Sequence, residues 1–108
     1  LNPTPGMSMT GTSRAVIEAC PPGVLGPDLA ACAAYGGAVD AATVLTCPVT
    51  IILGTLDRMT PRKAAQPLLD AMPSATIVEL PDSGHAPMME EPGAVRRALG
   101  DHLGRLAV

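Results

Sequence analysis

The 108-residue sequence has almost no aromatic residues, since Trp and Phe are absent and Tyr35 stands alone. Apolar residues still make up 47% of the chain and charged residues 16%, which is typical of a globular protein and not of a disordered one. Most apolar residues are Ala, Val, Leu and Met, which bury less area per side chain than Phe or Trp. The length is enough for one domain, and we expect that domain to have a thin core if the chain folds alone.

Long apolar runs, strong charge and regular cysteine spacing are also missing. No run approaches the roughly 20 residues of a membrane-spanning helix, and the first six residues lack the regions of a signal peptide. The net charge of −3, without a basic stripe, argues against nucleic acid as a partner. Cys20, Cys32 and Cys47 fit neither a disulfide framework nor a zinc site. We expect reduced, buried cysteines, no metal or organic cofactor, no membrane partner and a cytoplasmic location.

Residues 1–44 show little hydrophobic periodicity. Residues 1–12 are rich in Pro, Gly, Ser and Thr, which favours irregular structure. Ser13 could cap a short helix over 14–20, and Asp28 could cap a second helix over 29–35. A further turn or short helix is expected over 40–44.

The pattern changes after Cys47. The sequence predicts, in order, a strand at 49–53 buried on both faces, a polar loop, a helix with Thr60 as its cap and Pro61 at its first position, a strand at 76–80, a loop at 81–91, and a helix from Pro92. The apolar face of the last helix comprises Val95, Ala98, Leu99, Leu103 and Leu106. This order predicts an α/β structure with two parallel strands, a crossover helix and a closing helix.

Two chemically suggestive loops follow the two predicted strands. Asp57 lies on the first loop, and His85 follows Gly84 on the second. Open α/β sheets build their sites where parallel strands end, so neighbouring strands would bring these loops together. A carboxylate bonded to one ring nitrogen of a histidine leaves the other nitrogen free to act as a base.

Two segments carry a resemblance to a known family. Residues 47–61, CPVTIILGTLDRMTP, resemble the acid-bearing segment of α/β-hydrolase-fold enzymes, and residues 80–92, LPDSGHAPMMEEP, resemble their histidine segment. Each motif alone is weak, but both occur in order, each after a strand and before a helix. The resemblance covers roughly residues 45–106. It implies that residues 45–108 are the C-terminal strand–helix–strand–helix of the hydrolase core and that residues 1–44 are the end of a helical cap and the return of the chain to the sheet.

The resemblance also implies roles for single residues. Asp57 would be the acid of a catalytic triad, and His85 the general base that later protonates the leaving group. Pro61 would open the helix after the acid, while Glu90 and Pro92 would be structural and set up the final helix.

The nucleophile of such a triad is missing from this sequence. Family members carry it upstream of the acid, on a G-x-S-x-G elbow between a strand and a helix. The nearest string, at residues 6–10, ends in Thr10 where Gly belongs and has no strand before it, so Ser8 is a poor candidate. The nucleophile of the parent protein stays open as Ser, Asp or Cys, and so does its substrate.

Three functions follow as hypotheses. The first is the C-terminal part of a hydrolase acting on an ester, amide, lactone or related bond, inactive alone, whose partners are a small-molecule substrate and the missing N-terminal half of the fold. The second is a non-catalytic remnant that folds by docking on a partner, and the third a small binding protein using the pocket beside His85.

Met88 and Met89 either line a substrate pocket or fill the core. His102 is expected to be half-buried and structural. Two parallel strands leave at least one edge of the sheet without a neighbouring strand, and an exposed edge of this kind predicts self-association.

Overall fold

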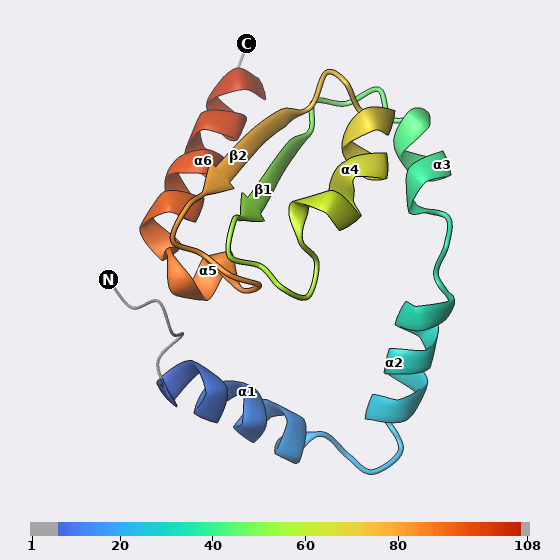
Figure 1. Ribbon diagram of the computed structural model, residues 1–108, viewed down its shortest axis with the longest axis vertical. Coiled ribbons are helices and arrows are strands. Elements are labelled where there is room, and N and C mark those ends of the chain that lie inside the picture. Colours follow the sequence, from blue (N-terminus) through green and yellow to red (C-terminus); the bar gives the residue numbers. More distant parts are fainter. Residues whose placement is uncertain (1–6, 107–108) are drawn as a thin grey trace. The chain divides into compact units, whose positions relative to one another are not determined.

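The chain divides into two compact units in the computed structural model. The model describes residues 7–106, with the side chains of residues 7–10 and 12 excepted. The described part of the first unit is residues 7–38, and that of the second is residues 39–106 (Figure 1). The earlier expectation, that residues 1–44 belong to a cap and residues 45–108 to the core, stays a prediction.

The first unit is helical, and its helices begin earlier than the sequence predicts. Helix α1 spans Met7–Ala19, so residues 7–12 are helical and not irregular. Helix α2 spans Leu25–Ala34, with Val24 at the N-cap position and Asp28 inside the first turn. Asp28 is therefore not the cap. Pro27 is compatible with this earlier start, because a proline in the first turn lacks only an N–H that would have no helical partner.

The second unit alternates helices and strands, which confirms the predicted α/β class and its two parallel strands. Its elements are, in chain order, α3 (Ala38–Thr43, which begins at the boundary), β1 (Thr50–Gly54), α4 (Arg62–Ala71), β2 (Thr76–Leu80), α5 (Pro87–Glu90) and α6 (Pro92–Leu106). Two local expectations are wrong. The N-cap of α4 is Pro61, in an extended conformation, and not Thr60. A four-residue helix, α5, interrupts the predicted loop.

Strands β1 and β2 are neighbours and run parallel. Thr50 pairs with Thr76 and Gly54 with Leu80, so the two strands end at the same level. Beyond the strands the pairing continues, since the Thr55 N–H donates to the Leu80 carbonyl at 3.0 Å. Among the described residues β1 pairs only with β2, and its other edge has no strand beside it. For this reason most of β1 is half-buried, although its sequence predicts full burial.

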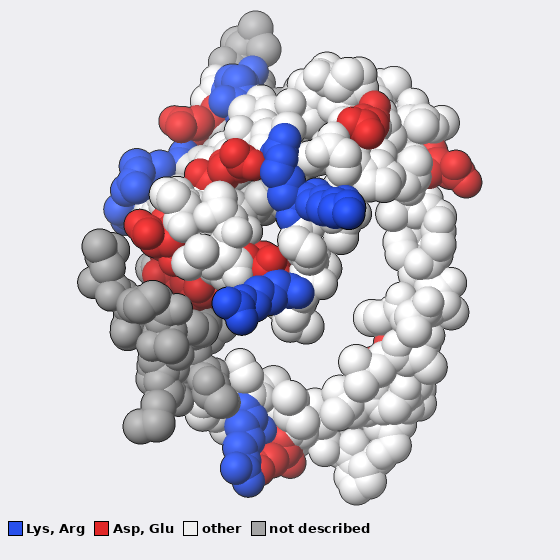
Figure 2. Space-filling view, viewed as in Figure 1, with Lys and Arg blue, Asp and Glu red and all other residues white. Residues whose placement is uncertain are grey.

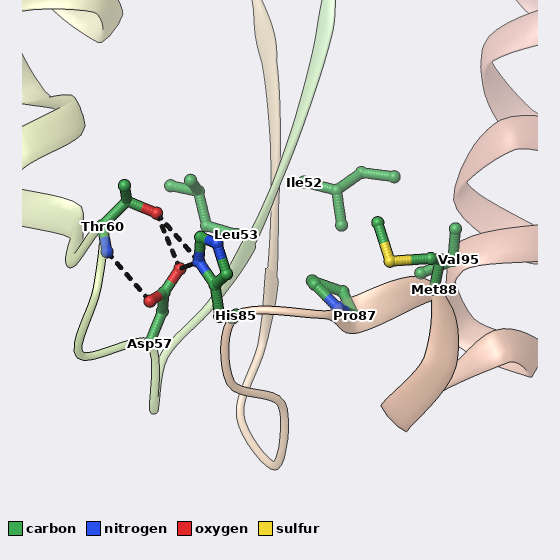
Figure 3. Close-up of a pocket in the computed structure, with 9 residues that line it drawn as sticks. Ile52, Leu53, Asp57, Thr60, His85, Pro87, Met88 and Val95 are labelled. Carbon is green, nitrogen blue, oxygen red and sulfur yellow. Dashed lines mark hydrogen bonds and ion pairs between the residues drawn. The ribbon is translucent and has the colours of Figure 1, made fainter. Parts of the chain in front are cut away.

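Helices α4 and α6 lie on opposite sides of the strand pair (Figures 1 and 3). Alternate residues of β1 face opposite ways, as in any strand. Thr50 faces α6, where its hydroxyl lies 2.9 Å from His102 Nδ1 and accepts a hydrogen bond from Arg105. His102 is half-buried, so the structural role expected for it agrees with its contacts.

The core is thin, as the composition predicts. The buried residues in the described range are few and mostly small: Ala42, Gly54, Leu69, Leu80, Ser83 and Ala98. The predicted apolar face of α6 is only partly covered, because Leu99 and Leu103 are 53% and 63% exposed. Two strands about 4.8 Å apart are too narrow to cover the whole face of a 15-residue helix.

Basic and acidic side chains lie among one another on the face of the α/β unit that Figure 2 shows. One such pair is Arg62 and Glu79, whose charged atoms lie 2.7 Å apart at the surface. All three cysteines are free, but Cys32 and Cys47 are exposed, so the expected burial is wrong for them. None of the described helices has the length and apolar composition needed to cross a membrane.

Candidate active site at the ends of the two strands

The loops that follow β1 and β2 are bonded directly to each other. The Leu56 N–H donates to the Ser83 carbonyl at 2.9 Å, and the Thr55 hydroxyl donates to the Pro81 carbonyl at 2.9 Å. These bonds extend the parallel pairing past the ends of both strands. They hold the segment before Asp57 against the segment before His85.

Gly54 allows this close approach. A Cβ atom at this position would lie 2.5 Å from the Ser83 carbonyl oxygen and closer still to the Gly84 oxygen, which no side chain tolerates. The backbone of Gly54 does not have a positive φ, so the requirement is for space and not for conformation. Ser83 is fully buried here, and its hydroxyl has no hydrogen-bond partner among the described residues.

The Asp57 carboxylate is held by four hydrogen bonds. Oδ1 accepts the backbone N–H groups of Met59 and Thr60 at 2.8 and 2.9 Å. Oδ2 accepts the Thr60 hydroxyl at 2.8 Å and faces His85 Nδ1 at 3.0 Å (Figure 3). The side chain is only 10% exposed. Each oxygen therefore has two partners, and the carboxylate has a single orientation.

These contacts change the acidity of Asp57. Burial by itself raises the pKa of a carboxyl, because it penalises the charged form. The bonds from the Thr60 N–H, the His85 ring, the Thr60 hydroxyl and the Met59 N–H outweigh burial and hold the pKa of Asp57 well below its usual value near 3.8. The group is thus a carboxylate throughout the neutral range.

His85 receives its orientation from Asp57. A carboxylate accepts hydrogen bonds, so Nδ1 carries the proton in this contact, and in the neutral imidazole Nε2 then presents a lone pair. The imidazole is 49% exposed, and Nε2 has no hydrogen-bond partner within residues 7–106. The arrangement is an imidazole oriented by a buried carboxylate, with its basic nitrogen available to another group.

Thr60 is the member of this site that sequence reasoning missed. Its position before Pro61 predicted a helix cap, but its hydroxyl bonds Asp57 and lies 3.4 Å from His85 Nδ1. A polar residue three positions after an aspartate can close a turn with it, and that spacing was the available signal.

A pocket of about 270 Å³ adjoins the oriented imidazole. Its wall is largely apolar and comes from β1, the two loops, α5 and α6. The lining residues are Ile52, Leu53, Gly54, Asp57, Thr60, His85, Pro87, Met88 and Val95. Met88 lines the pocket and is 62% exposed, so it is not core filler. Met89 is 46% exposed and is not among the lining residues.

The structure places the other two candidates in other elements. Ser8 lies in α1, in the other compact unit, and its side chain lies outside the described part of the chain. His102 bonds Thr50 at the opposite end of β1. Within residues 7–106, no group of three His, Cys, Asp or Glu side chains is placed to hold a metal ion.

Comparison with known proteins extends the resemblance seen in the two segments. A model described as the alpha/beta hydrolase family matches residues 6–98. A pimeloyl-[acyl-carrier protein] methyl ester esterase of Chromobacterium violaceum is 34% identical over 59 residues, which are 55% of this chain and 23% of that protein. A protein of the same name from Pectobacterium atrosepticum is 42% identical over 50 residues, which are 46% of this chain and 20% of that protein. The matches thus cover about a fifth of the length of these relatives.

Proposed function

Since the chain belongs to the alpha/beta hydrolase family, we propose that it forms the C-terminal part of an esterase, with Asp57 and His85 as two members of a nucleophile–histidine–acid triad. The observation that carries this proposal is the 3.0 Å contact from Asp57 Oδ2 to His85 Nδ1, made by a carboxylate whose other bonds are satisfied by Met59 and Thr60. The position of both residues on a pocket at the strand ends supports it.

In this proposal His85 moves protons and Asp57 keeps the ring in place. With a Ser or Cys nucleophile, His85 Nε2 takes the proton as the nucleophile attacks the ester carbonyl, and it returns that proton to the departing alcohol. It then takes a proton from the water that attacks the acyl-enzyme, and it returns this proton to the nucleophile as the acid is released. An Asp nucleophile carries no proton that His85 could pass to a departing alcohol, so an ester substrate favours a Ser or Cys nucleophile. Asp57 stays ionised and stabilises the imidazolium formed in each step.

The nucleophile is proposed to lie outside these 108 residues. The sequence contains no G-x-S-x-G elbow, and the donors of an oxyanion hole are expected beside such an elbow. The unpaired edge of β1 is the place where the rest of the sheet would join this unit.

The substrate is proposed to be an ester with an aliphatic chain. Both relatives are named pimeloyl-[acyl-carrier protein] methyl ester esterase. Ile52, Met88 and Val95 give the pocket beside His85 an apolar wall, which suits hydrocarbon better than a polar group. A small-molecule ester with a short chain is therefore the first substrate class to test.

The test measures ester hydrolysis by the protein that carries this chain, with aliphatic methyl esters and p-nitrophenyl esters. His85→Ala should lower kcat about 10³-fold or more. Asp57→Asn should lower it by a similar factor, because Asn no longer holds the His85 ring in the tautomer with its proton on Nδ1. His102→Ala is the matched control, since it removes the other histidine without touching the pocket. Equal activity in the His85 and His102 variants would refute the proposal and favour a non-catalytic domain.

The 108-residue chain alone should not hydrolyse esters above background. Turnover by this chain that disappears in His85→Ala would show that the nucleophile lies within these residues and would overturn that part of the proposal.

A further inference from the structure

Glu90, the last residue of α5, contacts the backbone on both sides of His85. Its Oε2 accepts the Gly84 N–H at 2.7 Å, and its Oε1 accepts the Ala86 N–H at 3.0 Å. Both contacts are partly buried. The two oxygens of one carboxylate thus bind the two peptide groups that flank the catalytic imidazole.

The contact with Ala86 is reciprocal. The Glu90 N–H donates to the Ala86 carbonyl at 2.9 Å, while the Ala86 N–H donates to the Glu90 carboxylate. The first bond is the ordinary i→i−4 bond of α5, and the second satisfies the N–H of Ala86, the N-cap residue, so both fix the start of α5. A helix of four residues has little stability of its own, so these bonds matter for its position.

Gly84 leaves room for the carboxylate. A Cβ on Gly84 would lie 3.2 Å from both Glu90 oxygens, which is tighter than an ordinary contact. On another side, Gly54 lies against the backbone of Ser83 and Gly84. The segment before His85 is therefore held by β1 and by Glu90, with a missing side chain at each contact.

We propose that Glu90 is a positioning residue for His85, which it holds through the Gly84 and Ala86 peptide groups. The inference rests on the proposed function of His85. His85 sits outside any helix or strand, so these two bonds and the Asp57 contact define where its ring lies. Glu90 does not line the pocket, so its effect should reach the reaction through His85 and not through substrate.

Glu90→Gln tests the role with little change in shape. The amide offers one acceptor, and its NH₂ group faces the second N–H, so one of the two flanking bonds is lost. Glu91→Gln is the matched control, because it removes the same charge one residue away. The Glu91 carboxylate makes no hydrogen bond or ion pair with residues 7–106.

The first measurement is NMR of the ¹⁵N-labelled protein at neutral pH. We expect low-field amide protons for Gly84 and Ala86, as for bonds to a carboxylate, and a low-field His85 Nδ1–H proton. In Glu90→Gln at least one amide proton should move upfield, and the Nδ1–H signal should broaden through faster exchange. Glu91→Gln should leave all three signals in place.

The second measurement is kinetics on the protein that carries this chain. Glu90→Gln should lower kcat about 10- to 100-fold with little change in KM, since a misplacement of about 1 Å can cost 10²-fold in rate. Glu91→Gln should keep the wild-type kcat. If Glu90→Gln does not fold, Glu90→Asp, which keeps the charge but is one methylene shorter, should show the same broadening of the Nδ1–H signal and a kcat below that of Glu91→Gln.

Two outcomes would overturn the inference: unchanged amide and Nδ1–H signals in Glu90→Gln, or a kcat equal to that of Glu91→Gln in an active enzyme. A protein that hydrolyses no ester would refute the proposed function alone. The NMR signals would then still decide whether Glu90 holds the His85 segment.

Discussion

Gly54→Ala should destabilise the α/β unit strongly, although it adds only one methyl group. The new Cβ would lie 2.5 Å from the Ser83 carbonyl oxygen and 2.8 Å from the Ser83 carbonyl carbon. These atoms belong to backbone, so no side-chain rotation relieves the overlap. Because the Gly84 oxygen is nearer still, strand β1 and the loop before His85 must instead move apart by more than about 1 Å to reach an ordinary carbon–oxygen separation of about 3.5 Å.

The size of the effect follows from what that movement disturbs. Adding a methylene to a packed site typically costs about 1–3 kcal/mol. Separation also weakens the 2.9 Å bond from the Leu56 N–H to the Ser83 carbonyl, worth about 0.5–1.5 kcal/mol. We expect a loss of about 2–4 kcal/mol in the free energy of unfolding, which is on the order of ten degrees or more in Tm for a unit of this size.

Gly100→Ala is the matched control. Gly100 lies inside α6, and a Cβ there would meet no atom within 4 Å. Alanine should therefore stabilise the helix by about 0.5–1 kcal/mol, the opposite sign to Gly54→Ala.

Urea denaturation followed by circular dichroism compares the wild type and both variants in the protein that carries this chain. A Gly54→Ala midpoint at or above that of the wild type would refute the close packing of β1 against the His85 loop. A parallel loss in both variants would point to a general intolerance of alanine and would also refute the steric explanation.

Three further predictions concern the site and the sheet edge. Thr60→Val should lower kcat about tenfold while Thr60→Ser restores it, because the hydroxyl donates a hydrogen bond to Asp57; equal kcat values for the two variants would contradict this. The pKa of Asp57 is lower in the folded protein than in the unfolded chain. The contribution of this carboxylate to the free energy of unfolding is therefore fully present above about pH 4 and is lost as the pH falls further. Urea midpoints measured between pH 6 and pH 2 should thus fall more steeply for wild type than for Asp57→Asn, and parallel curves would argue against the lowered pKa. The isolated 108-residue chain should self-associate through the free edge of β1, and light scattering that shows a monomer with sharp, cooperative thermal unfolding would contradict this.

Much of the second unit could be predicted from the sequence because local signals there agree with one another. The β-branched run before Gly54 and the run at 76–80 predicted strands, and both are present. Pro92 predicted the start of the last helix correctly. The first unit was harder, since weak helix propensities and proline positions are compatible with several helix starts, and α1 begins well before the predicted residue.

The sequence by itself identified Asp57 and His85 as the two residues of the candidate site. Asp57 and His85 each follow a strand, and strand order alone places such loops at one edge of a parallel sheet. The pairing of Thr50 with Thr76 then brings the two loops to the same level, as parallel neighbours require.

Only the tertiary structure decided how the two loops are held. The Thr60 hydroxyl turns toward Asp57 instead of capping α4, and Glu90 bonds the peptide groups around His85. Gly54 is required for space and not for a turn. These roles depend on distances between segments about 25 to 30 residues apart or on the path of a loop, and no propensity or periodicity encodes them. The physical reason is that local sequence fixes what each segment can form, while packing fixes which atoms come within bonding distance.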